Sequence, residues 1–407
     1  MENTSRFSQW IENIIEASLL LAVAFLPISK ALVEIGVSVS LLLWLAKKTW
    51  QREKLLTIPF FNVIYPIFLL VVCLSLINIP AESLKLGFRG ILKWLEYVGL
   101  FFLCAEVFQN PVRRKRLLVV FLISMTVTSL NGFYQLWSGT DLLRHRTLDP
   151  GRITRMKSSL GAPNTLASFF LFAIPLSYAA GFKNFGKNLK SIIVFLIFIL
   201  FCSAFIFTFS RAAFFGLLLS VIFHILVYRK WKLSLLLVAG TALLLFVFKD
   251  LYANYIGSLN LKDITIGERL GFWKTAWGMV QEHPFLGNGV NMYFHKLTSL
   301  TPAVDSIRKY AHNSYLQMWG EIGLFGLLAF ILPFLYTLCL TVQKKMASTE
   351  NVELLGALSI GVLAFLIQSF FDTNFYGLET SVLFWIFFGT QAGLLITSRA
   401  SKEAGLR

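Results

Sequence analysis

A histidine and two arginines stand beside long apolar segments, where charged side chains are rare and usually functional. His312 and Asn313 lie near the start of the stretch YAHNSYLQMWGEIG, residues 310–323, which continues as an apolar run. Arg211 lies in FTFSRAAFFG and Arg269 in ERLGFWKTAWGMVQEHPFLGNG. Arginine binds phosphate oxygens through paired hydrogen bonds, and a neutral imidazole accepts a hydroxyl proton near pH 7. These residue types suit transfer of a sugar from a lipid diphosphate, whose leaving group needs charge stabilisation and no proton.

Each of these residues also has a structural interpretation. Arg211 can reach the membrane interface from a tight turn, and Arg269 can pair with Glu268 on a helix that covers the bundle. His312 can bond to backbone or water at the start of a helix. The residues alone leave both interpretations open. For the remaining histidines we favour the structural interpretation: His145, His224, His283 and His295.

A polar stripe follows His312 along the expected helix. Asn313, Gln317 and Glu321 are spaced at i, i+4 and i+8 in an otherwise apolar run, so they need partners inside the bundle. Glu321 is nine residues from His312 and about half a turn off its face. In an unbroken helix Glu321 therefore cannot orient the imidazole.

The sequence lacks other catalytic signatures. It has no D-x-D, no His/Asp/Glu cluster with metal-ligand spacing, no G-x-S-x-G elbow, no Walker loop and no dinucleotide fingerprint. The cysteines lie in apolar runs without C-x-x-C spacing, which predicts neither disulfides nor a metal site: Cys73, Cys104, Cys202 and Cys339. We expect no metal and no cofactor.

Composition predicts an all-α polytopic membrane protein that forms one domain over residues 1–407. The 407 residues have a mean hydropathy of +0.69 and are 14% charged, against about 25% in soluble domains. Apolar runs long enough to cross a bilayer as helices recur about twelve times. The first has no cleavage site followed by a soluble domain and is expected to be retained. The expected spans are 14–28, 31–46, 60–77, 86–107, 117–137, 162–181, 191–209, 212–228, 233–248, 314–342, 352–371 and 381–398.

The basic residues predict the orientation of these spans. Every second loop is short and rich in Lys and Arg, as in RRKR at 113–116, so these loops and both termini are expected to be cytoplasmic. The outer face then receives two long connections, 138–161 and 249–313. The net charge of +16 is explained by orientation and by anionic membrane lipids rather than by nucleic acid.

The two outer connections carry further candidate residues. The first contains more basic than acidic side chains, which indicates an anionic ligand outside; its candidate contacts are Arg144, Arg146, Arg152 and Arg155. In the second, the periodicity through Arg269, Trp273 and Val280 predicts a helix of about four turns at the membrane surface. Its end is expected at His283 and Pro284, before a turn that contains Gly287 and Gly289.

Three segments in this order resemble the bacterial O-antigen ligase family, whose motif region also occurs in O-antigen polymerases. They are SRAA, ERLGFW…HPFLGNG and AHNSYLQMWGEIGLFG. The resemblance is densest from about residue 195 to about residue 390. It implies a metal-independent glycosyltransferase of the inner membrane, GT-C-like in architecture, with a periplasmic active site. Such an enzyme moves a glycan from undecaprenyl diphosphate to a sugar of the lipid A core.

The resemblance also implies roles for individual residues. Arg211 and Arg269 match the family's diphosphate-binding arginines, and His312 matches its candidate general base. Asn313 and Gly289 match motif positions and are expected to lie at the substrate.

Two alternatives remain open. A polymerase would use the same chemistry with a second lipid-linked glycan as acceptor. A transporter or flippase of anionic lipid-linked sugars belongs to another class, whose members tend to have pseudo-symmetric halves and charges near the bilayer midplane. Here the distinctive residues lie toward one face, and no repeat is visible.

Overall fold

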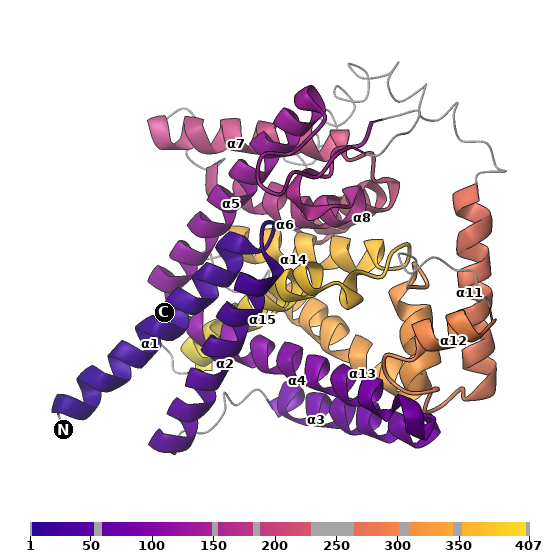
Figure 1. Ribbon diagram of the computed structural model, residues 1–407. Coiled ribbons are helices and arrows are strands. Elements are labelled where there is room, and N and C mark those ends of the chain that lie inside the picture. The colour runs from indigo at the N-terminus through magenta and orange to yellow at the C-terminus, as the bar shows by residue number, and fades with distance from the viewer. Residues whose placement is uncertain are drawn as a thin grey trace.

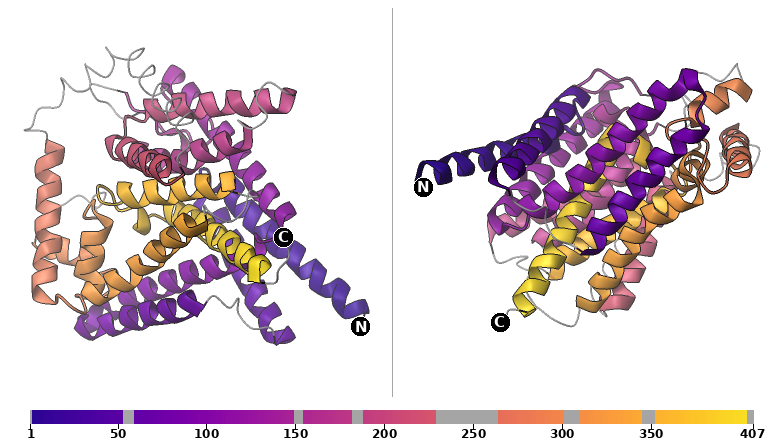
Figure 2. Two further views of the ribbon diagram at one scale, coloured as in Figure 1. Left: turned by 180° about the vertical axis from the view of Figure 1, so that it is seen from behind. Right: turned by 90° about the horizontal axis from the view of Figure 1, so that it is seen from below.

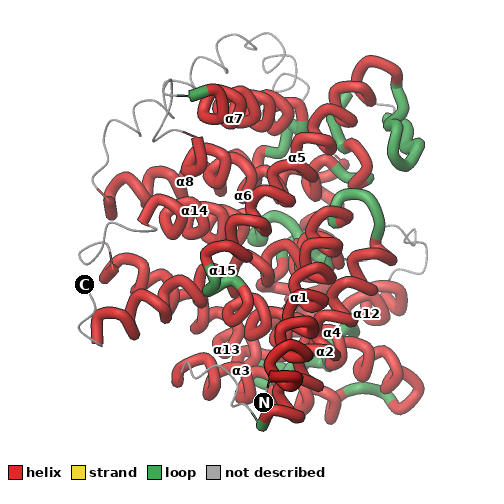
Figure 3. Tube along the Cα trace, turned by 90° about the vertical axis from the view of Figure 1, so that its left-hand side faces the viewer, coloured by secondary structure: helices red, strands yellow, loops and turns green. Residues whose placement is uncertain are grey.

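The computed structural model describes residues 2–52, 59–148, 154–181, 188–228, 264–300, 310–344 and 352–403. This part of the chain is almost entirely helical and contains no strand (Figure 3). Its α-helices are α1 (Glu2–Phe25), α2 (Lys30–Gln51), α3 (Pro59–Leu74), α4 (Leu84–Val107), α5 (Pro111–Ser138), α6 (Pro163–Gly181), α7 (Leu189–Phe207), α8 (Arg211–Tyr228), α11 (Ile264–Glu282), α12 (Tyr293–Leu300), α13 (Ser314–Lys344), α14 (Val352–Gln368) and α15 (Leu378–Glu403). Short 3-10 helices lie between them: η1 (Ser75–Asn78), η2 (Ala81–Ser83), η3 (Ser158–Leu160) and η5 (Asn374–Tyr376).

These helices confirm the predicted fold class. Eleven of the twelve expected spans coincide with helices, and the span expected at 233–248 lies outside the described residues, as do 249–263 and 301–309 of the second long connection. Two helices, α8 and α14, are apolar but shorter than 18 residues in their apolar part. Six are long and apolar enough to cross a membrane: 60–78, 111–138, 163–181, 189–207, 314–343 and 378–396. The chain is an all-α, multi-pass membrane protein.

The core of the bundle is built around α15. Gly389 and Gly393 lie one turn apart on this helix, and a Cβ at either position would press against a backbone carbonyl of α4. Small residues four apart allow two membrane helices to come into backbone contact. Beside them, the fully buried ring of Trp385 contacts aromatic rings of α3, α4 and α13. Close packing, the main source of helix association in lipid, thus holds the centre of the bundle.

The loops expected on the outer side meet at one end of the bundle. We call it the site end and define it by residues 75–83, 154–162, 207–210, 283–291, 310–314 and 369–377. Hydrogen bonds join these segments: Ser314 N–H to Ser369 O (2.9 Å), Met156 N–H to Phe207 O (2.8 Å) and Val290 N–H to Ser75 Oγ (3.1 Å). Helices α11 and α12 lie at this end, at the right of Figure 1, whereas α1 begins and α15 ends on the opposite side (Figures 1 and 2).

Charged residues of the expected cytoplasmic loops form ion pairs at the opposite end. Glu12 lies 2.6 Å from Lys47 Nζ and 2.8 Å from an Nη atom of Arg113, which links α1 to α2 and α5. Glu16 accepts from Arg116 at 3.0 Å. These ion pairs and the site end lie at opposite ends of α5, a helix of 28 residues and about 42 Å.

Candidate active site

His312 lies at the site end, immediately before α13. Its φ is +52°, a left-handed conformation that residues other than glycine rarely adopt and that recurs at functional sites. Its Nδ1 atom lies 3.3 Å from Oδ1 of Asp372, in the turn between α14 and α15, and its side chain is 34% exposed. The imidazole also contacts the ring of Phe272 on α11, with 5.9 Å between the ring centres. Two segments that are distant in the sequence thus contact this histidine.

Asp372 is held as a carboxylate. Its side chain is 16% exposed, and Oδ1 also accepts the N–H of Thr373 at 2.9 Å. Burial by itself raises the pKa of this carboxyl, but the hydrogen bond and charge of His312, with the Thr373 N–H and the side chain of Asn164, outweigh it and lower the pKa below its usual value. A carboxylate accepts only, so Nδ1 must carry a proton and Nε2 is then the basic nitrogen. This arrangement is that of a general base with an orienting carboxylate.

Sequence reasoning missed Asp372. It excluded Glu321 as the residue that orients His312, and the structure agrees, but it assigned no other partner. A signal was present in the order of the spans. The segment FFDTN ends the eleventh expected span, so the alternation of loops puts Asp372 on the same side as His312.

The polar stripe on α13 finds its partners inside the protein. Asn313 caps the helix, since its Oδ1 accepts from the N–H groups of Tyr315 and Leu316 at 3.1 and 3.0 Å. Gln317 accepts the N–H of Ala311 and donates to Glu321 at 3.2 Å. The buried carboxylate of Glu321 accepts three further hydrogen bonds, from Asn291 N–H, Tyr293 N–H and Tyr376 Oη, each 3.1 Å long. The stripe fixes the segments that flank the histidine.

Helix α13 is interrupted at Gly323, where φ is 70° and ψ is 179°. The turn between α11 and α12 hydrogen-bonds two carbonyls before the interruption and two N–H groups after it: Asn288 N–H to Gly320 O (2.9 Å), Gly289 N–H to Glu321 O (2.8 Å), Leu324 N–H to Pro284 O (2.9 Å) and Phe325 N–H to Phe285 O (3.3 Å). In lipid each unpaired group would cost several kcal/mol. The HPFLGNG and GEIG segments therefore form one structural unit.

Two glycines of this unit have conformations that require glycine. Gly287 has a φ of +75° and lies against the backbone of Glu321. Gly289 has a φ of +106°, and a Cβ there would overlap the side chain of Ile79. The backbone of Gly289 thus forms part of the turn, and its expected place at the substrate stays a prediction. The predicted end of α11 before His283 is confirmed, since the helix ends at Glu282.

The structure brings the two motif arginines toward His312. Arg269 lies on α11, one turn before Phe272, whose ring touches the imidazole, and its side chain is half-buried. Arg211 begins α8, which runs antiparallel to α14: Gly216 lies against Ala364 and Gln368, and Phe215 contacts Phe371. This register puts the exposed Arg211 level with the turn that carries Asp372.

The first long connection presents two arginines from an ordered loop. Asp141 accepts the N–H groups of Leu143, Arg144 and Arg146 at 2.6 to 2.9 Å. Burial raises the pKa of Asp141, but these N–H groups and Asn131 lower it below its usual value. Burial and then the neighbouring charge of Arg144 lower the pKa of Arg146, so the two guanidiniums are close enough to interact.

The other two candidate arginines of the first long connection are Arg155 and Arg152. Arg155 donates through Nε to Thr208 O and through Nη2 to Asn164 Oδ1, both at 2.9 Å. Two of its donors are therefore engaged within the protein. Arg152 lies outside the described residues.

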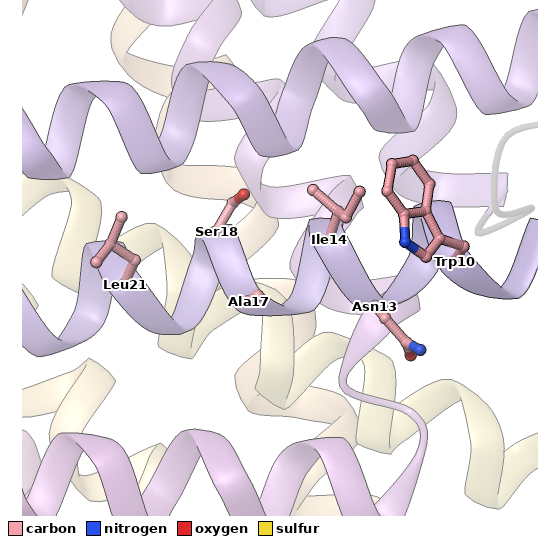
Figure 4. A pocket seen from close by; sticks show the side chains of 6 residues that line it. All are labelled: Trp10, Asn13, Ile14, Ala17, Ser18 and Leu21. Atoms are coloured by element: carbon pink, nitrogen blue, oxygen red, sulfur yellow. The ribbon is translucent and has the colours of Figure 1, made fainter.

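The described residues contain no group of three or more His, Cys, Asp or Glu side chains that could hold a metal ion. An open depression of about 440 Å³ runs along α1 (Figure 4), and no candidate site residue lines it. It is bordered by Trp10, Asn13, Ile14, Ala17, Ser18 and Leu21.

The chain is a multi-pass α-helical membrane protein with a histidine–aspartate pair at the site end, and α8 and α11 carry the two motif arginines. Residues 196–331 match the family described as O-antigen ligase, and this segment contains Arg211, Arg269 and His312. Over this segment the chain is similar to the O-antigen ligase family, which supports the assignment that its motifs predicted. It is also 25% identical over 120 residues to a Haemophilus influenzae protein with the description "Uncharacterized protein". The aligned part is 28% of this chain and about 30% of that relative.

Proposed function

We propose that this protein is a glycosyltransferase of the O-antigen ligase type. It moves a glycan from undecaprenyl diphosphate to a sugar hydroxyl of the lipid A core, without a metal ion, at the periplasmic face of the bacterial inner membrane. The observation that carries the proposal is the contact between His312 and Asp372 at the end of the bundle that also holds Arg211 and Arg269. The family match supports it.

The proposed reaction is one displacement. Nε2 of His312 takes the proton of the acceptor hydroxyl as its oxygen attacks the anomeric carbon of the glycan. The bond between that carbon and the diphosphate oxygen breaks, and undecaprenyl diphosphate leaves with the electron pair. Arg211 and Arg269 stabilise its negative charge, while Asp372 holds the imidazole and stabilises its cation. Arg144 and Arg146 are proposed as further contacts for the anionic donor.

The sidedness of the site can be tested by labelling single cysteines in a protein whose native cysteines are replaced. Ser138→Cys and Ser299→Cys occupy exposed positions on the two long connections, and Gln51→Cys occupies an exposed position at the opposite end of α2. A thiol reagent that cannot cross membranes should label the first two in intact cells, and Gln51→Cys only after permeabilisation. The reverse pattern would contradict the periplasmic site and the cytoplasmic termini.

Replacing Arg211 or Arg269 with lysine should slow transfer about ten- to a hundredfold. Lysine keeps the charge but loses the paired hydrogen bonds to phosphate oxygens, about 1.5 to 3 kcal/mol if they act in the transition state. Arg116→Lys is the matched control, since Arg116 pairs with Glu16 at the other end of the bundle. Rates are measured with purified proteins and a lipid-linked glycan. Wild-type rates in both variants would refute paired arginine binding of the diphosphate.

The proposal as a whole is tested with purified protein, a lipid-linked glycan and either core lipid or a second lipid-linked glycan, with a chelator present. A glycan joined to core lipid identifies the ligase. A lengthened lipid-linked glycan identifies the polymerase, the second candidate, which uses the same residues. Movement of the donor across vesicles with no new glycosidic bond would identify a transporter and overturn the proposal. Activity that requires a divalent ion would contradict the metal-independent mechanism.

A further inference from the structure

Polar contacts connect His312 and Asp372 with the first long connection. The side chain of Asn164, the second residue of α6, is one of the hydrogen-bonding groups that lower the pKa of Asp372, and Asn164 O accepts from Nε2 of Gln368, four residues before Asp372, at 3.2 Å. Asn164 Oδ1 in turn accepts from Arg155 Nη2 at 2.9 Å, and Arg155 Nε donates to Thr208 O at 2.9 Å. Residues from four parts of the sequence thus form one series of polar contacts, which ends at the imidazole of His312.

The chemistry of the two neighbours fixes the orientation of the Asn164 amide. A guanidinium only donates hydrogen bonds, and an ionised carboxylate only accepts them. The amide oxygen must therefore face Arg155, and the amide NH₂ must face Asp372. An aspartate of the same size would satisfy the arginine but would turn a second carboxylate toward Asp372. Asparagine suits this position because it accepts on one side and donates on the other.

Asn164 is also held through its backbone. Its carbonyl oxygen accepts from Gln368 Nε2 at 3.2 Å, which ties the start of α6 to the end of α14, four residues before Asp372. Ser168 on the next turn of α6 donates to the same carbonyl and to Gln368 Oε1, at 3.0 and 2.8 Å. These contacts hold the backbone of Asn164 in place, so its side-chain amide can orient the carboxylate of Asp372.

We propose that Asn164, oriented by Arg155, is a positioning residue: it holds the carboxylate of Asp372 so that His312 keeps its proton on Nδ1 and presents Nε2 to the acceptor. The proposal rests on the proposed function for the identity of the acceptor but not for the orientation of the imidazole. Arg155 thus acts on the reaction through the base, apart from any contact with the donor.

The first test measures which ring nitrogen of His312 carries the proton, and it needs no substrate. The chain has five histidines, so ¹⁵N-labelled histidine gives few signals, and the signals of His312 are those missing from the His312→Ala protein. At neutral pH the wild-type imidazole should be protonated on Nδ1. Asn164→Ala should give a mixture of tautomers, whereas Ser177→Ala, a change farther along α6 where the hydroxyl donates to Ile174 O, should leave the wild-type form. An unchanged tautomer in folded Asn164→Ala protein would overturn the positioning role.

The second test is kinetic. Asn164→Ala should lower kcat about ten- to a hundredfold, the usual effect of removing an outer partner of a functional histidine, with the KM for the donor unchanged. Asn164→Asp, which keeps the contact with Arg155, should be at least as slow as Asn164→Ala. In an Asp372→Asn background the further change Asn164→Ala should cost nothing, because both act through one carboxylate. Additive losses, or a fast Asn164→Asp protein, would refute the proposal.

The two tests separate this proposal from the function on which it rests. A tautomer that is fixed in the wild type and lost in Asn164→Ala supports the positioning role even if no glycan transfer is found, in which case the proposed function alone fails. If His312→Ala is slow while Asn164→Ala transfers glycan at the wild-type rate, the positioning role fails and the proposed function stands.

Discussion

A His312→Ala protein is expected to transfer glycan about 10²- to 10⁴-fold more slowly than the wild type, the usual contribution of a positioned general base. The reason is that the acceptor hydroxyl must lose its proton, and His312 is oriented for this by Asp372 at 3.3 Å. Binding of the lipid-linked donor should persist, because the histidine acts on the acceptor. The measurement is the rate of product formation with purified protein, alongside donor binding and a thermal unfolding curve.

The role of His312 can also be tested through the pH dependence of the transfer rate and with a control variant. Wild-type activity should fall as the pH is lowered, because a protonated base cannot accept the hydroxyl proton, and this fall should vanish in His312→Ala. Asp372 is not the cause we expect, since its hydrogen bonds lower the pKa of this carboxyl below its usual value. His295→Ala is the control, because His295 is exposed on α12 near the same end. Normal transfer by folded His312→Ala protein would show that His312 has only a structural role.

Gly323→Ala should destabilise the fold by several kcal/mol and abolish activity. The φ of 70° and ψ of 179° belong to a region that is essentially restricted to glycine, and a Cβ would overlap the backbone carbonyl of Phe285. Movement away from this overlap would break the hydrogen bonds between the interrupted helix and the turn after α11, and in lipid each lost partner costs several kcal/mol. Size-exclusion chromatography and thermal unfolding in detergent would measure the effect.

Two nearby glycines provide matched controls for this variant. Nothing lies within 4 Å of a Cβ built at Gly271 or Gly278 on α11. Alanine at these helical positions should be tolerated or stabilising by up to about 1 kcal/mol, because alanine favours a helix over glycine. A Gly323→Ala protein as stable as the two controls would show that the interruption of α13 does not depend on its backbone conformation.

The role of Gly323 could not be predicted from the sequence. Spacing and residue type indicated a turn at Gly287 and Gly289 and a polar stripe through Glu321. They did not indicate that α13 breaks at Gly323, nor that the turn supplies the missing partners. The reason is physical: an interrupted helix is stable in lipid only when another segment binds its free backbone groups, and that segment lies more than thirty residues away in the chain.

The sequence by itself determined the properties that depend on local composition. Apolar runs of sufficient length must form helices in a bilayer, because only a helix satisfies every backbone group within one segment, and this determined the fold class and the placement of eleven helices. Residue type in turn limited the chemistry of Arg211, Arg269 and His312. The tertiary structure alone decided which polar residues meet. Along the chain, Asp372 lies 60 residues from His312, and Asn164 lies 208 residues from Asp372. Hydropathy shows that such groups need partners inside the bundle, but the choice of partner follows from helix packing, which brings the ends of α6, α8 and α14 together.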